Sequence, residues 1–128
     1  MAAEGFRGPQ QLWKALIWSM QGLRAGWRHE ASFRFEACLA VVAIPLGLYL
    51  GHGALEKLAL VLPMLLVLSA ELLNSAIEAI VDKVSPEFNE LAGRAKDMGS
   101  AAVFVLLVVL GLSWLVIIGP RLPFAASL

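Results

Sequence analysis

The sequence contains 128 residues, of which 59% are hydrophobic and 16% are charged, and its mean hydropathy is +0.77. This composition is too apolar for an ordinary soluble domain and indicates a small polytopic membrane protein, with residues 1–128 forming one domain. Ten basic and ten acidic residues give a formal net charge of zero, so we expect no nucleic-acid partner. The single cysteine excludes an intrachain disulfide. The first thirty residues lack the pattern of a cleaved signal peptide, so we expect the N-terminus to be retained.

The first predicted element is a helix over residues 9–30 with one apolar face. Its apolar side chains recur at helical spacing, and no acidic residue interrupts the basic ones before position 30. A basic amphipathic helix of this kind is typical of a segment that lies in the headgroup layer of a membrane. We therefore expect a surface helix, which could also dock on the protein's own helices. The apolar positions are Trp13, Leu16, Ile17, Met20, Leu23 and Trp27, and the basic ones are Lys14, Arg24 and Arg28.

Three apolar stretches follow, at residues 33–50, 58–81 and 98–119. Each is long enough to cross a hydrocarbon core about 30 Å thick. The alternation expected of strands is absent, and an open sheet cannot stand in lipid. We therefore predict an all-α fold with three transmembrane helices. Between the second and third stretches, Ser85-Pro86-Glu87 predicts the start of a short helix that Gly93 would end.

Basic residues concentrate before the first apolar stretch and in the connection at 82–97. The connection at 51–57 carries only Lys57, and the tail after the third stretch carries only Arg121. Loops rich in Lys and Arg stay on the cytoplasmic side. We expect a multi-pass protein with its N-terminus and the 82–97 connection in the cytoplasm and its C-terminus outside.

The second apolar stretch contains two carboxylates and an amide, which are costly in lipid. A charged side chain at the centre of a membrane helix costs about 2.5–3.5 kcal/mol on insertion scales, so it is seldom there without a role. At about 100° per residue, Glu71, Asn74, Glu78 and the following Asp82 lie within a stripe roughly 80° wide. This stripe indicates either a cation site or a buried polar network that locks helices together.

Several charged residues fall near the predicted cytoplasmic boundary: Glu30, Glu78, Asp82, Lys96 and Asp97. Glu71 would lie about 10 Å deeper than Glu78 at the helical rise. Hard divalent cations prefer oxygen ligands, usually one or two carboxylates plus substrate phosphates. The combination suits phosphoryl transfer from a soluble nucleotide to a molecule dissolved in the membrane. A proton or ion pathway and a purely structural network remain alternatives, and the standard kinase motifs are absent.

Small residues in the second and third stretches permit close approach of helices. They occur in the segments 69–70, 75–76 and 99–102. Three helices alone cannot enclose four polar positions on one of them. We therefore expect a homo-oligomer with its sites between helices.

Two sequence blocks carry a resemblance to a known family. They are ELLNSAIEA at 71–79, followed by Val81-Asp82, and GRAKDMGSAA at 93–102. With Gly22-Leu23-Arg24-Ala25 and the segment 30–36, the chain closely resembles the bacterial integral-membrane diacylglycerol kinase family over roughly residues 12–118. The resemblance implies a homotrimer in the bacterial inner (cytoplasmic) membrane, with active sites shared between neighbouring subunits. It also implies phosphorylation of diacylglycerol by ATP, with Mg²⁺ or another divalent cation, to give phosphatidic acid.

A related branch of the family phosphorylates undecaprenol. The form of the 93–102 block and the segment Gly22–Trp27 look more like the diacylglycerol branch. Undecaprenol kinase is therefore the alternative enzyme, and a structural or ion-conducting membrane oligomer is the non-enzymatic one. Two positions depart from the family pattern: Gln11 stands where the family has an arginine, and Asn89 where a histidine is common.

The resemblance also implies roles for individual residues. Glu71 looks like the catalytic base, Glu30 and Glu78 look like the metal ligands, and Asn74 and Asp82 look like supporting residues. The implied ATP contacts are Trp18, Glu30, Glu78, Glu87, Phe88, Asn89, Lys96 and Asp97. The implied lipid contacts are Leu16, Ile17, Ser19, Met20, Arg24, Ala25, Gly26, Trp27, Ser32, Phe33, Arg34, Phe35, Glu36, Glu71 and Ser100.

Overall fold

The computed structural model describes residues 8–127, apart from the side chain of Ala126. Its elements in chain order are α1 (Pro9–His29), α2 (Ala31–Leu50), α3 (Gly53–Val84), α4 (Glu90–Ile118) and two short 3₁₀ helices, η1 (Gly119–Arg121) and η2 (Ala125–Ser127). No strand occurs in the described range, so the predicted all-α fold is confirmed. Three of the helices, α2, α3 and α4, are long and apolar enough to cross a membrane, as predicted. The outermost parts of the predicted domain, 1–7 and 128, lie outside the described residues.

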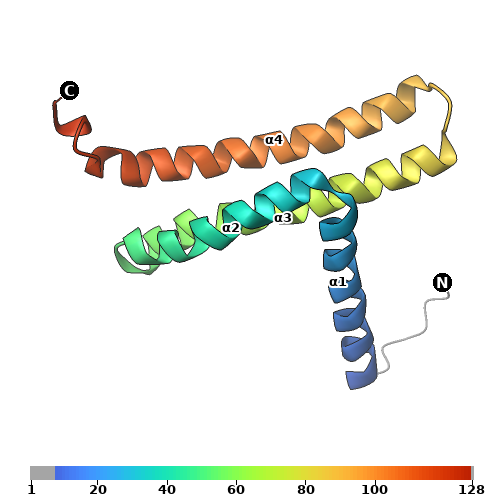
Figure 1. Cartoon of the computed structure of the whole chain (residues 1–128), viewed down its shortest axis with the longest axis horizontal. Helices are drawn as coiled ribbons and strands as arrows, with labels where there is room; N and C mark the ends of the chain where they lie inside the picture. Colours follow the sequence, from blue (N-terminus) through green and yellow to red (C-terminus); the bar gives the residue numbers. More distant parts are fainter. Residues whose placement is uncertain (1–7, 128) are drawn as a thin grey trace.

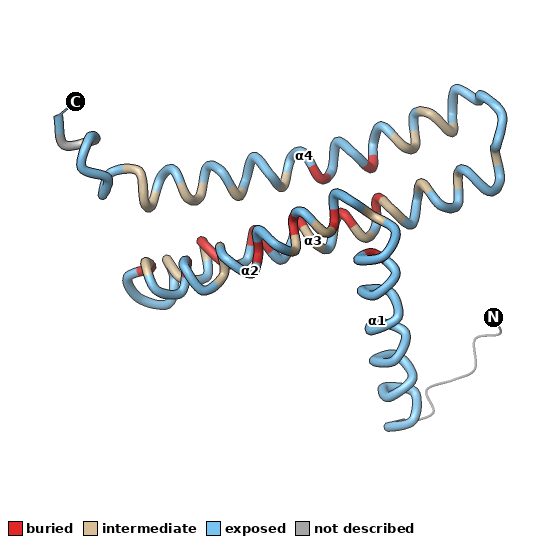
Figure 2. The backbone as a smooth tube through the Cα atoms, viewed as in Figure 1, coloured by how far each residue is buried: buried red, intermediate tan, exposed pale blue. Residues whose placement is uncertain are grey.

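Helix α3 is the central element of the molecule. Both α2 and α4 pack against it and run in the opposite direction to it, whereas α1 leaves this group crosswise (Figure 1). Its fully buried Met64 and Val67 form a small core with Ala40 of α2, against which Leu106 and Leu110 of α4 also pack. The buried residues lie where the helices face each other, and most of the rest of the described chain is exposed or half-buried (Figure 2). Many of the exposed side chains are large and apolar. Such a surface suits contact with lipid.

The corner between α1 and α2 is formed at Glu30. Its extended backbone ends α1, and its N–H donates to the carbonyl of Gly26 at 3.0 Å. The Nη1 of Arg34 then donates to the carbonyls of Trp27 and Arg28 at 3.0 and 3.3 Å. These bonds satisfy carbonyls that the end of α1 would leave without partners. They fix the direction in which α1 leaves α2, and they place Glu30 at the corner.

The far end of the molecule is held by Arg121 of η1. Its Nη2 donates to both carboxylate oxygens of Glu56, at 2.9 and 2.8 Å, and its Nη1 donates to the carbonyl of Leu50 at 3.1 Å. The same carboxylate accepts the N–H of His52 at 2.7 Å, at the start of α3. A bidentate arginine–carboxylate pair is geometrically specific. It joins the end of α4 to the turn between α2 and α3.

The prediction of a helix start at Ser85-Pro86-Glu87 is wrong. Residues 85–89 are not helical, and α4 begins at Glu90 and continues through Gly93. Asn89 is the N-cap, because its side-chain oxygen accepts the N–H groups of Leu91 and Ala92 at 3.0 and 3.1 Å. Two bonds to one cap outweigh the local preference of a serine before a proline.

Candidate functional site

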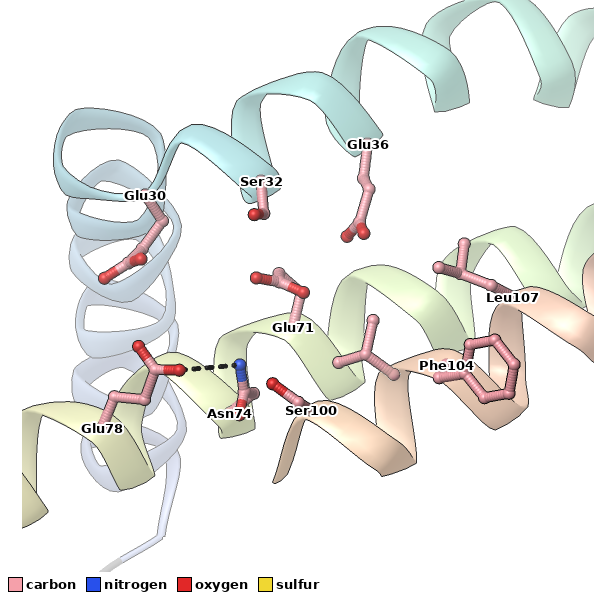
Figure 3. Close-up of a pocket in the computed structure, with 10 residues that line it drawn as sticks. Glu30, Ser32, Glu36, Glu71, Asn74, Glu78, Ser100, Phe104 and Leu107 are labelled. Atoms are coloured by element: carbon pink, nitrogen blue, oxygen red, sulfur yellow. Dashed lines mark hydrogen bonds between the residues drawn. The ribbon is translucent and has the colours of Figure 1, made fainter. Parts of the chain in front are cut away.

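A polar pocket of about 290 Å³ lies where α2, α3 and α4 meet near the corner with α1. Figure 3 shows its polar side chains pointing toward one another from these helices. Its lining residues are Glu30 at the corner, Ser32 and Glu36 of α2, Glu71, Asn74 and Glu78 of α3, and Ser100, Val103, Phe104 and Leu107 of α4. Four carboxylates therefore line one small pocket, three of them on helices that are apolar enough to span a membrane.

The α3 side of the pocket is the stripe that helical periodicity predicted. Glu71 and Asn74 are buried, with 6% and 8% of their surface exposed, and Glu78 is half-buried. The Nδ2 of Asn74 makes a long contact of 3.5 Å to Oε1 of Glu78 (Figure 3). The three side chains lie on one side of the helix because residues three or four apart are neighbours on a helix surface.

Two buried oxygen atoms of the pocket lack hydrogen-bond partners among the described residues: Oε2 of Glu36 and Oδ1 of Asn74. Buried polar atoms are normally satisfied, and each of these two oxygens can still accept a hydrogen bond or bind a cation. No lysine or arginine is among the residues that line the pocket. A group of carboxylates and an amide oxygen without a counter-charge is chemically suited to a hard divalent cation.

The carboxylates are not gathered tightly enough to enclose an ion by themselves. Within residues 8–127, no cluster of three His, Cys, Asp or Glu side chains could hold a metal ion. Mg²⁺ usually takes only one or two protein carboxylates and completes its shell with water and substrate phosphates. The residues present fit such an ion when it arrives with a phosphate ligand.

Asn74 is positioned by a close approach of α3 and α4. A Cβ atom on Gly99 of α4 would overlap Oδ1 of Asn74 and lie 3.3 Å from its Cγ. Position 99 therefore needs a residue without a side chain. The predicted role of the small residues at 99–102 in close helix approach is confirmed at Gly99, and it brings the neighbouring Ser100 to the pocket.

Asp82 and Lys96 lie outside the pocket and bind each other. The Nζ of Lys96 is 2.9 Å from Oδ1 of Asp82. Lys96 lies before the apolar segment 98–119 that we expect to cross the membrane. The hydrogen bond to Asp82 raises the pKa of the Lys96 ammonium group above its ordinary value. The ammonium group therefore stays charged. Asp82, the last member of the predicted stripe, is exposed and is not a pocket residue.

The predicted residues of α1 do not line the carboxylate pocket. Ser19, Ala25 and Gly26 line a second and larger pocket, of about 670 Å³, between α1 and α3, and Glu30 lines both pockets. Six further α1 positions lie away from both pockets and are exposed: Leu16, Ile17, Trp18, Met20, Arg24 and Trp27.

Several predicted residues of α2 and of the 85–97 segment also lie outside the carboxylate pocket. Phe33 is buried beside Gly26, Arg34 holds the end of α1, and Phe35 is exposed. In the connection after α3, Glu87 and Phe88 are exposed, Asn89 caps α4, and Asp97 is exposed. Their predicted roles stay predictions.

Three pocket residues were not predicted: Val103, Phe104 and Leu107. Their spacing from Ser100 is three, four and seven residues, which is the spacing of one helix face. That signal was present in the sequence, but uniformly apolar stretches do not show which face of a helix meets a polar site.

The sequence of the chain is similar to those of known proteins. A family model described as "Prokaryotic diacylglycerol kinase" matches residues 17–118. The chain is 40% identical over 116 residues to a protein named diacylglycerol kinase from Escherichia coli (strain K12), covering 91% of this chain and 95% of that relative. It is 45% identical over 97 residues to one from Haemophilus influenzae, covering 76% and 82%. It is 44% identical over 115 residues to one from Pseudomonas aeruginosa, covering 90% and 94%.

Proposed function

The chain belongs to the prokaryotic diacylglycerol kinase family, and from this premise we propose that it is a membrane enzyme that transfers the γ-phosphoryl group of ATP to diacylglycerol. The product is phosphatidic acid. The observation that carries the proposal is the convergence of Glu30, Glu71 and Glu78 on one pocket that no basic side chain among the described residues lines. A structural network would not need so many uncompensated carboxylates in an apolar setting.

In this reaction the carboxylates have different roles. The acceptor hydroxyl attacks the γ-phosphorus, a new O–P bond forms, and the bond between the γ-phosphorus and the bridging oxygen breaks, releasing ADP. Glu71 accepts the hydroxyl proton, as a positioned general base does. Glu30 and Glu78 would hold Mg²⁺, which, when bound, neutralises charge on the phosphate oxygens. Of the two carboxylates on α3, Glu71 lies further than Glu78 from the α3–α4 connection, which favours a position for Glu71 on the side of the lipid acceptor.

Placement in the membrane follows from the apolar helices. The segments 33–50, 58–81 and 98–119 cross the bacterial cytoplasmic membrane, with the N-terminus and the α3–α4 connection in the cytoplasm. The exposed apolar face of α1, with Trp13 and Trp27, lies in the headgroup layer. The pocket then opens near the cytoplasmic interface, where soluble ATP and a membrane lipid can meet.

The active form is a homotrimer with sites shared between subunits. Lys96 does not line the carboxylate pocket of its own chain, although a phosphate site requires positive charge. A neighbouring subunit can supply it across the interface. The exposed apolar sides of α2, α3 and α4 supply the surface for such packing.

The deciding experiment measures transfer of labelled γ-phosphate by the purified protein in lipid. Diacylglycerol and undecaprenol are presented in parallel, with and without Mg²⁺. We expect phosphatidic acid only when the metal is present. Preference for undecaprenol would overturn the choice of acceptor, and phosphorylation of neither lipid would overturn the enzyme assignment in favour of a structural or ion-conducting oligomer.

A further inference from the structure

Two hollows lie one after the other along α2 and α4: the carboxylate pocket and, further from the corner with α1, an apolar groove. Both helices pack against α3 and run in the same direction (Figure 1), and they barely touch each other. Beyond the polar pocket, an apolar groove of about 320 Å³ lies between them. Its lining residues are Leu39, Val42, Ala43 and Leu46 of α2, and Leu107, Leu110, Gly111 and Trp114 of α4.

The groove adjoins the carboxylate pocket, because Leu107 lines both. Figure 3 shows Phe104 and Leu107 at one end of the polar pocket, with Glu30 and Glu78 toward the other. A molecule whose hydroxyl lies at Glu71 therefore meets charged side chains in one direction and an apolar wall in the other. The direction of Leu107 suits a hydrocarbon chain.

Trp114 is the lining residue of α4 that lies furthest along the helix from Leu107. Its Nε1–H donates to the carbonyl of Leu60 on α3 at 3.1 Å, which fixes the indole ring. The ring also reaches α2, because a Cβ atom on Gly47 would lie 3.5 Å from its Cζ2. Trp114 thus contacts α3 and lies near the backbone of α2, so its ring lies across the groove on the side away from the carboxylate pocket.

The dimensions fit part of one acyl chain. Residues 107 to 114 span about 10 Å at the rise of an α-helix, which is about two thirds of one leaflet of a hydrocarbon core roughly 30 Å thick. A helix of a second copy fits less well, because it is about 10–12 Å across with its side chains, and a segment of it about 10 Å long would exceed the groove's volume of about 320 Å³. A volume of about 320 Å³ is that of a small-molecule site.

We propose that the groove between α2 and α4 binds an acyl chain of the lipid acceptor and that Trp114 sets the length of chain that fits. This inference rests on the proposed function, since it names how that function's substrate is recognised. An acyl chain in the groove would orient the glycerol hydroxyl at Glu71. Trp114 is then a specificity-determining residue that does not touch the reacting atoms.

The first test fills the groove. Nothing lies within 4 Å of a Cβ atom built on Gly111, so Gly111→Leu should fold while its side chain blocks the path. We expect kcat/KM for dipalmitoylglycerol to fall at least about tenfold relative to dioctanoylglycerol, because single methylenes in apolar pockets carry effects of that order. Val109→Phe, on the opposite face of α4, is the matched control and should leave the ratio unchanged.

A second variant and a turnover-independent readout complete the design. Trp114→Leu should raise kcat/KM for the longer chains relative to the wild type. A diacylglycerol with a diazirine at its acyl terminus should label Leu110 or Trp114 after irradiation, with the adducts mapped by mass spectrometry. Because labelling needs no turnover, it separates this proposal from the kinase assignment. Adducts at Trp114 without phosphorylation of any lipid would overturn the proposed function alone.

Three outcomes overturn the groove assignment. One is an active Gly111→Leu variant with an unchanged chain-length profile. Another is adducts confined to the second pocket between α1 and α3. The third is dissociation of the oligomer by Gly111→Leu, measured by its size in detergent, with an unchanged profile; that result would make the groove an interface between copies.

Discussion

Lys96 Nζ lies 2.9 Å from Oδ1 of Asp82, and this ion pair joins the last turn of α3 to the beginning of α4. Both side chains are solvent-accessible, so the pair adds little to stability in water. The ion pair instead fixes where the Lys96 ammonium group lies, near the loop between the two helices. If Lys96 contacts ATP phosphates, Asp82 is the residue that positions it.

Lys96→Met should raise KM for MgATP by roughly tenfold, because a charge-assisted hydrogen bond to phosphate is lost. Asp82→Asn should raise KM by a smaller factor, since the ammonium group remains but is less well held. Lys83→Met, an exposed lysine on the same turn as Asp82, is the control. Initial rates against MgATP concentration measure the effects. An unchanged KM in Lys96→Met would remove Lys96 from the nucleotide site.

The acidic side of the site follows from the sequence with little ambiguity. Polar residues in an apolar helix are conspicuous, and helical periodicity alone places Glu71, Asn74 and Glu78 on one face. The existence of the apolar helices follows in the same way, since lipid leaves few alternatives. The bounds do not: α3 extends from Gly53 to Val84, beyond the apolar stretch, because helices continue past the hydrocarbon until a cap or turn ends them.

Contacts between distant segments could not be predicted. Arg121 binds Glu56 from 65 positions away, and Trp114 donates to Leu60 from 54 positions away. No local pattern specifies which loop residues meet after helices pack. Asn89 was predicted as a nucleotide contact from the family resemblance, and the structure shows that it caps α4. A polar residue in a loop often has such a structural role, which spacing alone cannot separate from ligand binding.

Substitution of the predicted metal ligands should separate metal use from assembly. Glu30→Gln and Glu78→Gln should each raise the Mg²⁺ concentration needed for half-maximal turnover by about tenfold or more. Even mutation of residues that only hydrogen-bond to a metal's ligands lowers metal affinity or activity by that order. The oligomer should persist, because burying a neutral amide costs less free energy than burying a carboxylate. Mg²⁺ titration and size measurement in detergent check the two parts. Full activity at low Mg²⁺ in either variant would show that its carboxylate is not a ligand.

Gly99→Ala should displace the side chain of Asn74 in the carboxylate pocket. The new methyl group would overlap the amide of Asn74, and overpacking of this kind costs about 1–3 kcal/mol. We expect a lower midpoint of thermal unfolding and a lower kcat. Gly93→Ala, on the same helix with nothing within 4 Å of its Cβ position, is the control. It should be neutral or slightly stabilising, since alanine is favoured over glycine in helices by about 1 kcal/mol. Equal effects of both substitutions would contradict the close contact.

Glu71→Gln should abolish turnover while MgATP still binds. The amide has nearly the shape of the carboxylate but cannot accept the hydroxyl proton, and a general base contributes roughly 10²–10⁴-fold. Glu71→Asp should retain little activity, because the shorter side chain withdraws the carboxylate from the hydroxyl. Glu90→Gln, an exposed position in the first turn of α4, controls for loss of one negative charge.

Binding and turnover must be measured on the same preparation of Glu71→Gln, because the two readouts assign different roles to the residue. Lost turnover with unchanged MgATP affinity identifies the base. Weakened MgATP binding would instead make Glu71 a metal ligand, which its place beside Glu30 and Glu78 in one pocket also allows. Turnover within a few fold of the wild type would mean that another group accepts the proton. The carboxylate to test would then be Glu36, which lines the same pocket and whose Oε2 is buried without a hydrogen-bond partner among the described residues.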